Sequence, residues 1–189
     1  MRRFVIVGNK ARGGFSLDDL PGTSGRLDLL LRSARAALLV SHGVRRDTIV
    51  YLVLGGDPAG PRTLRIDGPT AKFLRPDERA FAVIAQKALA SSTGFGDPTR
   101  GVSVAAGGLD LALADAGPGA LYVLDEAAPR DLREGTIDPD PIFVLGDHLG
   151  LDPATRARVG GAALRIGPVS VHADDAVAVV VNELDRQGR

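Results

Sequence analysis

Short apolar runs alternate along the chain with stretches of helical periodicity, and this alternation predicts its elements. Near-continuous apolar runs are typical of strands that are buried on both faces of a sheet. The strands expected on this basis are Phe4–Val7, Thr48–Leu54, Thr63–Ile66, Gly101–Ala105, Leu121–Leu124, Ile142–Leu145 and Ala162–Ile166. Strands of this kind, interleaved with helices, predict an α/β fold with a mostly parallel sheet.

Helical spacing of apolar residues marks the segments between the strands. In Gly25–Val40, leucines and alanines recur at helical spacing and the arginines fall elsewhere, which indicates an amphipathic helix that stops before Gly43. Further helices are expected from Pro76 to about Ala90, over Gly108–Ala116, and after Val169. The stretches Asn9–Ser24 and Asp125–Asp140 are polar, and loops of such length are usually functional or disordered.

Two glycine turns follow apolar runs in the C-terminal part of the chain, at Gly146-Asp147-His148 and Gly167-Pro168-Val169. Open α/β sheets bind their ligands at the carboxyl ends of strands, where these turns are expected. Neither turn matches a phosphate-binding fingerprint, and the side chains around them are small or apolar. A ligand there would meet main-chain N–H and C=O groups, which favours a nucleoside-like cofactor over a polyphosphate. Ordinary turn chemistry is the alternative explanation of these glycines.

The composition narrows the class of protein. A chain of 189 residues with 44% hydrophobic residues is expected to form one domain over residues 1–189. The absence of cysteine excludes disulfides, cysteine-ligated zinc and thiol catalysis. No apolar run approaches the roughly 18 residues of a membrane span, and the N-terminal run lacks a signal-peptide pattern, so we expect a soluble, cytoplasmic protein. A net charge of zero gives no overall preference for a polyanion.

Common nucleotide-binding and catalytic motifs are absent, including the P-loop, the dinucleotide fingerprint and the nucleophile elbow. His42, His148 and His172 lack the spacing of metal ligands, so no metal site is expected. Two charged clusters remain as candidates, Arg26-Leu27-Asp28 and Arg75-Pro76-Asp77-Glu78-Arg79, each at the start of an expected helix. Each is also explained by acids that favour a first helical turn or by a solvated helix start.

Five motifs follow one another along the chain: SLDDLPG-x-x-GRLDLLLR, L-x-PDER, GVSV, PIFVLGDH, and LRIGP before a long helix. In this order, over nearly the whole chain from Arg3 to Asp185, they resemble the pseudouridine N1-methyltransferase family of the SPOUT class. Archaeal members of that family methylate pseudouridine at position 54, in the TΨC loop of tRNA. The resemblance lies in the order of the motifs, since no single motif decides it.

The resemblance implies a SPOUT-type α/β fold, with helices on both faces of the sheet and a deep trefoil knot at about residues 120–186. Such knots are rare exceptions to unthreaded topology. It also implies a homodimer, and the cofactor S-adenosyl-L-methionine bent into the knot loops. The cofactor-binding residues that it implies are Leu124, Gly146, Leu164, Arg165, Ile166, Gly167, Pro168, Val169 and Asp174. Asp174 is a departure, because family members often carry Ser-His or Ser-Cys where this chain has Ala173-Asp174-Asp175.

The reaction implied is transfer of a methyl group to N1 of pseudouridine, which needs a base for the N1 proton or donors that stabilise the developing anion. Asp28 is the candidate for holding or accepting that proton, and Arg26 for stabilising charge on the base or a phosphate. The candidate residues for binding the tRNA are Arg32, Arg45, Arg46 and Arg79. Because the target base lies in a folded loop, we expect it to be flipped out.

Two other functions stay open at this point. A pseudouridine methylase acting on ribosomal RNA is one, although it would be expected to carry more basic insertions. The other is a non-catalytic regulator that binds RNA or an adenosyl ligand with the same knotted fold, and the acidic pair Asp174-Asp175 keeps that alternative open. Cofactor binding without methyl transfer would distinguish the second from an enzyme.

Overall fold

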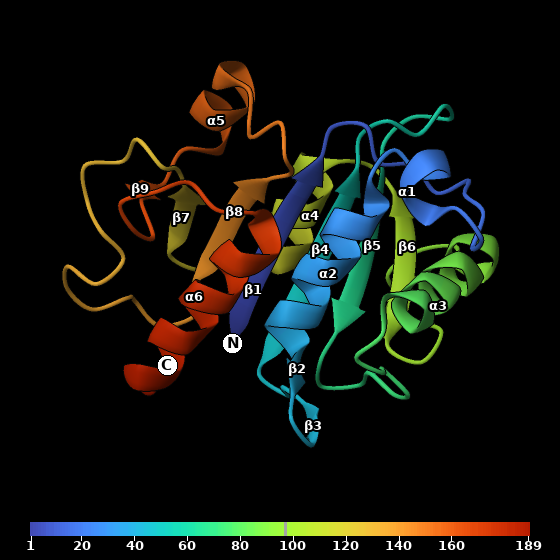
Figure 1. Cartoon of the computed structure of the whole chain (residues 1–189), viewed down its shortest axis with the longest axis horizontal. Helices are drawn as coiled ribbons and strands as arrows, with labels where there is room; N and C mark the ends of the chain where they lie inside the picture. Colours follow the sequence, from blue (N-terminus) through green and yellow to red (C-terminus); the bar gives the residue numbers. More distant parts are fainter. Residues whose placement is uncertain (97) are drawn as a thin grey trace.

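The computed structural model describes residues 1–96 and 98–189, and a seven-stranded sheet forms its centre (Figure 1). The sheet has the order β6-β5-β4-β1-β8-β7-β9. Its strands are β1 (Arg2–Gly8), β4 (Thr48–Leu54), β5 (Arg62–Asp67), β6 (Val102–Ala106), β7 (Leu121–Leu124), β8 (Ile142–Gly146) and β9 (Ala162–Leu164). Neighbouring strands in the series β4-β1-β8-β7-β9 are parallel, whereas β5 pairs antiparallel with both β4 and β6. The prediction of an α/β fold with a mostly parallel sheet is confirmed.

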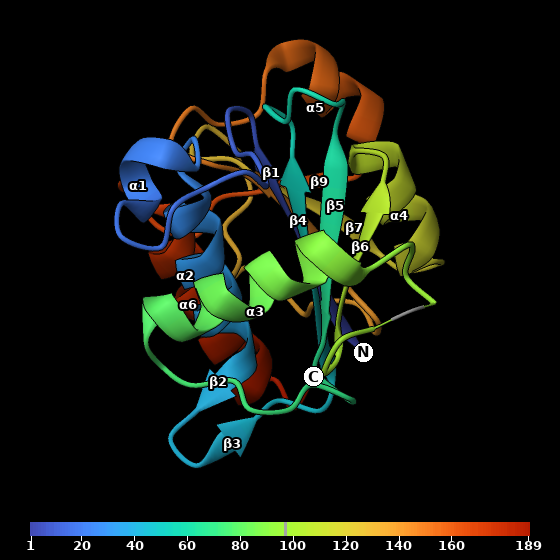
Figure 2. The same cartoon turned by 90° about the vertical axis from the view of Figure 1, so that its right-hand side faces the viewer.

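Helices cover both faces of this sheet, as expected (Figures 1 and 2). The helices are α1 (Leu20–Thr23), α2 (Leu27–Leu38), α3 (Glu78–Ser91), α4 (Leu109–Ala116), α5 (Pro153–Val159) and α6 (Ala173–Arg186). Alternate residues of β1 enter different cores, because side chains of a strand point to opposite faces. Phe4 and Ile6 pack with α2, α3 and α6 on one face, whereas Val5 and Val7 pack with α4 on the other. This two-sided burial explains the continuous apolar runs of the central strands.

Helix α2 differs from its expected limits at both ends. It begins at Leu27 because Gly25 and Arg26 have left-handed φ angles of 61° and 71°. Position 25 requires glycine, because a Cβ atom there would lie against the carbonyl of Lys10. The helix ends at Leu38, and a hairpin of β2 (Leu39–Val40) and β3 (Gly43–Val44) follows in place of the expected last helical residues.

The two short helices α1 and α5 were not expected from the periodicity. Each begins with an aspartate that accepts a hydrogen bond from a backbone N–H and is followed by proline in the first turn. Asp152 accepts from Thr155 N at 2.9 Å and thereby caps α5. Helices this short lack the several turns that an apolar periodicity needs to be recognised. Within the described residues, no helix has both the length and the apolarity to cross a membrane.

The long loop Asp125–Asp140 holds the chain that follows β9. Arg165 N donates to Arg130 O at 2.9 Å, and Leu132 N donates to Arg165 O at 2.8 Å. Further along, the Gln187 side chain accepts from Ile137 N at 2.9 Å. Figure 1 shows this loop as a wide arc around the segment that leads from β9 into α6. These contacts agree with a chain that passes through a loop, and the trefoil knot at about residues 120–186 stays a prediction.

Candidate functional site

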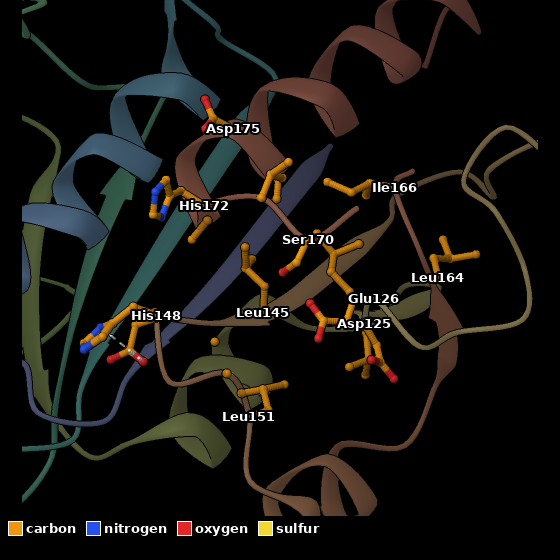
Figure 3. Close-up of a pocket in the computed structure, with 18 of the residues that line it drawn as sticks. Asp125, Glu126, Leu145, His148, Leu151, Leu164, Ile166, Ser170, His172 and Asp175 are labelled. Atoms are coloured by element: carbon orange, nitrogen blue, oxygen red, sulfur yellow. Dashed lines mark ion pairs between the residues drawn. The ribbon is translucent and has the colours of Figure 1, made fainter. Parts of the chain in front are cut away.

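A cavity of about 800 Å³ opens at the carboxyl ends of β7, β8 and β9 (Figure 3). It is built from the three segments that follow these parallel strands, which is where open α/β sheets bind ligands. Its lining comprises Val123–Glu126, Leu145–Leu151, Arg156, Leu164, Ile166, Gly167, Val169–Ala173, Asp175 and Ala176. This volume lies within the range of about 300–1,000 Å³ for sites that bury small ligands and cofactors.

The wall of the cavity combines apolar side chains with a few acids and imidazoles. Leu145, Leu164 and Ile166 offer apolar surface to a flat ring. The carboxylates of Asp125 and Glu126 lie on one side of the cavity, and the imidazoles of His148 and His172 on the other (Figure 3). Carboxylates in the lining favour a ligand that carries positive charge, since an opposite charge offsets the cost of taking them out of water.

Most of the expected cofactor-binding residues meet at this cavity. Its lining includes Leu124, Gly146, Leu164, Ile166, Gly167 and Val169, whereas Arg165, Pro168 and Asp174 are not part of it. The Arg165 side chain turns towards the loop Asp125–Asp140, where it lies 3.3 Å from Asp131 and 3.5 Å from Glu134. Arg165 therefore fastens that loop, and its part in cofactor binding stays a prediction for its main chain only.

Gly146 allows the turn after β8 to fold tightly over the strand end. A Cβ atom at this position would lie 2.2 Å from the carbonyl carbon of Gly150, far inside van der Waals contact. The next residue, Asp147, is buried and accepts from Asn9 N at 2.9 Å, Asn9 Nδ2 at 3.2 Å and Leu149 N at 2.9 Å. This carboxylate thus ties the turn to the end of β1. Sequence reasoning did not assign it a role, because Asn9 is 138 residues away along the chain.

The two expected catalytic residues form an ion-pair cluster with Arg32 and Asp174. Arg26 Nε and Nη2 donate to the two oxygens of Asp28 at 3.0 and 3.2 Å, and the Asp28 side chain is only 3% exposed. Arg32 lies 3.8 Å from Asp28 and 3.7 Å from Asp174, so it bridges the start of α2 to the start of α6. The cluster adjoins the cavity, because Asp175, next to Asp174, belongs to the cavity lining.

Arg26 combines a fixed acidic partner with partial exposure to solvent. The hydrogen bond to Asp28 raises the pKa of Arg26, burial opposes this rise, and the charges of Asp147 and Glu78 add to it. The link of Arg26 to the cavity runs through Asp28, Arg32 and Asp174 to the lining residue Asp175. The Arg26 side chain is 41% exposed and is accessible to a substrate. A fixed cation beside a ligand cavity suits the stabilisation of negative charge on a reacting group.

The expected RNA contacts differ in how far the fold already uses them. Arg45 donates to both oxygens of Asp185 at 2.9 and 2.7 Å, and Arg46 donates to Gly68 O at 2.8 Å and Ala71 O at 2.9 Å. Arg45 thereby holds α6, and Arg46 holds the β5–α3 connection. The same N–H groups would be needed to bind a phosphate. Arg79 lies 3.6 Å from Asp18 and is 63% exposed, so it stays accessible. Across residues 1–96 and 98–189, no group of three acids or histidines could hold a metal ion.

Comparison with known proteins gives the family. The family model described as "Putative SAM-dependent RNA methyltransferase" matches residues 1–189. Three curated relatives are named tRNA (pseudouridine(54)-N(1))-methyltransferase. The protein of Thermococcus kodakarensis is 40% identical, with 98% of this chain and 99% of that protein covered. The protein of Halobacterium salinarum is 38% identical, with 100% and 98% covered, and that of Methanosarcina mazei is 38% identical, with 98% and 92% covered.

A solved structure supports the fold independently. Archaeoglobus fulgidus Nep1 bound to S-adenosylhomocysteine matches 98% of this chain and 98% of its own, with a TM-score of 0.67 and 15% identity. This likeness confirms the expected architecture. Together with the full-length family match and relatives near 38% identity, it shows that this chain belongs to the family of S-adenosylmethionine-dependent RNA methyltransferases.

Proposed function

We propose that this protein transfers a methyl group from S-adenosyl-L-methionine to N1 of pseudouridine 54 in tRNA. The observation that carries the proposal is the junction of two parts: a cavity at the carboxyl ends of β7, β8 and β9, and the Arg26–Asp28 pair, which Arg32 and Asp174 connect to the start of α6 beside the lining residue Asp175. The curated relatives that carry this activity in their names align with essentially the whole chain, including the segments that form both parts.

The cavity fits this cofactor in size and in chemistry. Its apolar wall, formed by Leu124, Leu164 and Ile166, suits the adenine ring, and main-chain groups of the turns at Gly146 and Gly167 would contact its edges. Asp125 is already paired with Arg156, whereas the acids Glu126 and Asp175 suit the positive charges of the amino and sulfonium groups. The bound cofactor supplies an electrophilic methyl group. The protein has then to orient the acceptor nitrogen and manage its proton.

The Arg26–Asp28 pair is placed to do both. In the reaction a bond forms between N1 and the methyl carbon, the carbon–sulfur bond breaks, and N1 loses its proton. Asp28 is buried between Arg26 and Arg32, and it holds the N1 proton by a hydrogen bond or accepts it. Arg26 stabilises the negative charge that develops on the uracil ring as the proton leaves. Positioning accounts for much of the acceleration, since a fixed near-attack geometry removes much of the entropic barrier.

The active form is proposed to be a homodimer that works on tRNA in the cytoplasm. Three of the large exposed apolar side chains lie around the cavity: Leu149, Val169 and Val171, which are 53%, 68% and 43% exposed. Such a concentration of exposed apolar surface is typical of a protein interface. Packing of a second copy over these residues would shield the cavity from water.

A binding protein without methyl transfer is the second candidate. The bidentate contact with Arg26 engages both carboxylate oxygens of Asp28, so an N1 proton must compete with two charged hydrogen bonds for this carboxylate. Calorimetry with S-adenosylmethionine, followed by transfer of radiolabelled methyl groups to total tRNA and to ribosomal RNA, separates the candidates. We expect cofactor binding and label in tRNA. Label in ribosomal RNA alone would identify a different substrate, binding without label would support the second candidate, and no binding would refute both.

A further inference from the structure

Phe73 is an aromatic side chain held in solvent by a strained backbone. It follows β5, its side chain is 70% exposed, and its φ angle is 61°, in the left-handed region. Bulky residues rarely adopt this conformation, and such strain is usually retained where function requires it. Arg100, on the turn before β6, also has a left-handed φ of 55°. Its guanidinium carbon lies 4.8 Å from the centre of the Phe73 ring, in a cation–π contact.

The backbone around this pair is fixed by hydrogen bonds. Lys72 N donates to Arg100 O at 3.1 Å, which joins the two segments directly. The β5–α3 connection is held from below by Arg46, whose guanidinium donates to two of its carbonyl groups. Gly101 packs so closely that a Cβ atom would lie 2.5 Å from the backbone of Ala71. Phe73 and Arg100 therefore stand on a rigid support, which lowers the entropic cost of binding a ligand.

Besides Arg100, two further cations stand close to Phe73 in the sequence. Lys72, Arg75 and Arg100 are all exposed. Among residues 1–96 and 98–189, no acid forms an ion pair with any of these three side chains. Elsewhere the arginines of this neutral chain are mostly paired with acids, as Arg65 is with Asp67. An aromatic ring stacked with arginine and flanked by free cations is the chemistry with which proteins bind unpaired nucleotides.

This surface lies at the opposite end of the sheet from the cavity. Gly68 N donates to Thr48 O, the first residue of β4, whereas the cavity adjoins the carboxyl ends of the parallel strands. Figures 1 and 2 both place the β5–α3 connection at the end remote from α5. The seven residues of β4 separate the two levels by about 20 Å.

We propose that Phe73 and Arg100 form a stacking platform for an unpaired nucleobase of the substrate RNA, with Lys72 and Arg75 binding the adjacent phosphates. This inference rests on the proposed function, because the base on the platform belongs to the RNA whose target nucleotide enters the cavity. A protein partner is disfavoured, since one phenylalanine ringed by cations lacks the apolar core of a protein interface. The platform lets the enzyme recognise a folded tRNA, which carries unpaired bases beyond the arm that is methylated.

Phe73→Gly tests the platform. Glycine removes the ring and relieves the left-handed strain, so Tm is expected to stay unchanged or rise. Affinity is measured by fluorescence anisotropy with two RNAs, a full-length tRNA with pseudouridine 54 and the isolated T-arm hairpin with the same nucleotide. The stem of the hairpin offers no unpaired base at the distance of the platform. We expect the affinity for full-length tRNA to fall about 5- to 100-fold, and the affinity for the hairpin to change less than about twofold.

Two further variants complete the test. Phe73→Trp retains a larger stacking surface and is expected to keep or improve tRNA affinity. Arg100→Ala is expected to weaken tRNA binding, whereas Lys87→Ala, which removes one exposed charge from the outer side of α3, is expected to have little effect. Equal losses for tRNA and hairpin, unchanged tRNA affinity in Phe73→Gly, or no tRNA binding by the wild-type protein would each overturn the inference. Binding losses confined to full-length tRNA, in a protein that methylates no pseudouridine, would refute the proposed function and leave the platform supported.

Discussion

The ion pair between Arg26 and Asp28 makes the sharpest prediction about catalysis. Asp28→Asn keeps the size of the side chain and removes the charge that holds the Arg26 guanidinium at 3.0 and 3.2 Å. Charged hydrogen bonds contribute about 1.5–3 kcal/mol each. Because the Arg26 side chain is 41% exposed, water screens the pair, and we expect the variant to lose only about 1–2 kcal/mol of folding stability.

The loss of activity is expected to be much larger than the loss of stability. A positioned group that handles a proton contributes about 10²- to 10⁴-fold to the rate, so kcat should fall at least about 100-fold in Asp28→Asn. Arg26→Gln removes the partner and is expected to lose a similar factor. Since the two side chains act as one unit, the double variant should lose far less than the product of the two single losses. Neither residue lines the cavity, so the Kd for the cofactor should change less than about twofold.

Single-turnover methyl transfer to tRNA, with cofactor binding by calorimetry, measures these quantities. Asp110→Asn is the matched control, because Asp110 is 76% exposed on α4 and is outside the cavity lining. Losses that multiply in the double variant would show that Arg26 and Asp28 act independently. A large rise in the cofactor Kd would show that the pair belongs to the cofactor site, and either result would refute the reasoning.

Three further predictions concern the cavity, the fold and the assembly. Gly146→Ala must displace the Gly150 backbone and should lower both Tm and cofactor affinity. A Cβ atom at Gly167 meets no atom within 4 Å, so Gly167→Ala should keep Tm but lower cofactor affinity roughly tenfold by crowding the ligand. At Asp185, burial opposes ionisation, but hydrogen bonds from Arg45 and Arg2 outweigh it and hold the pKa below its ordinary value. The stability that this group contributes is therefore present above its unfolded pKa and lost as the pH falls through the lower folded pKa, and acid titration of Asp185→Asn by circular dichroism should show a smaller loss than wild type. If the proposed homodimer forms, Val171→Glu should convert it to monomer in sedimentation equilibrium, and an unchanged mass would count against the proposed interface.

The strands were predictable because local pattern alone determines them. Two-sided burial of β1, β4 and β8 gives short continuous apolar runs. The position of the cavity was predictable for a related reason, since glycine turns after parallel strands fall at one edge of the sheet. Gly146 and Gly167 both lie there. The catalytic role of Arg26 and Asp28 came from the family resemblance, because their spacing alone could not be distinguished from that of a favourable helix start.

The features that were missed depend on contacts between distant segments. The buried carboxylate of Asp147 acquires its role only when Asn9 is brought beside it. Asp125 and Glu126 looked like part of a charged, irregular loop, and they became cavity residues because β7 and β9 pair side by side. The exposure of Phe73 was equally hidden, because a left-handed backbone leaves no trace in hydrophobic periodicity. Local pattern thus predicts where elements lie, and tertiary contacts decide which loop residues become functional.

The central claim is methyl transfer to N1 of pseudouridine 54, and paired tRNA transcripts test it most directly. One transcript carries pseudouridine at position 54 and the other carries uridine, and each is incubated with the protein and radiolabelled S-adenosylmethionine. Nucleoside analysis by mass spectrometry then locates the methyl group. The account predicts N1-methylpseudouridine in the first transcript and no label in the second, because the N1 nitrogen of uridine is bonded to the ribose. Label in the uridine transcript, or in neither, would contradict it.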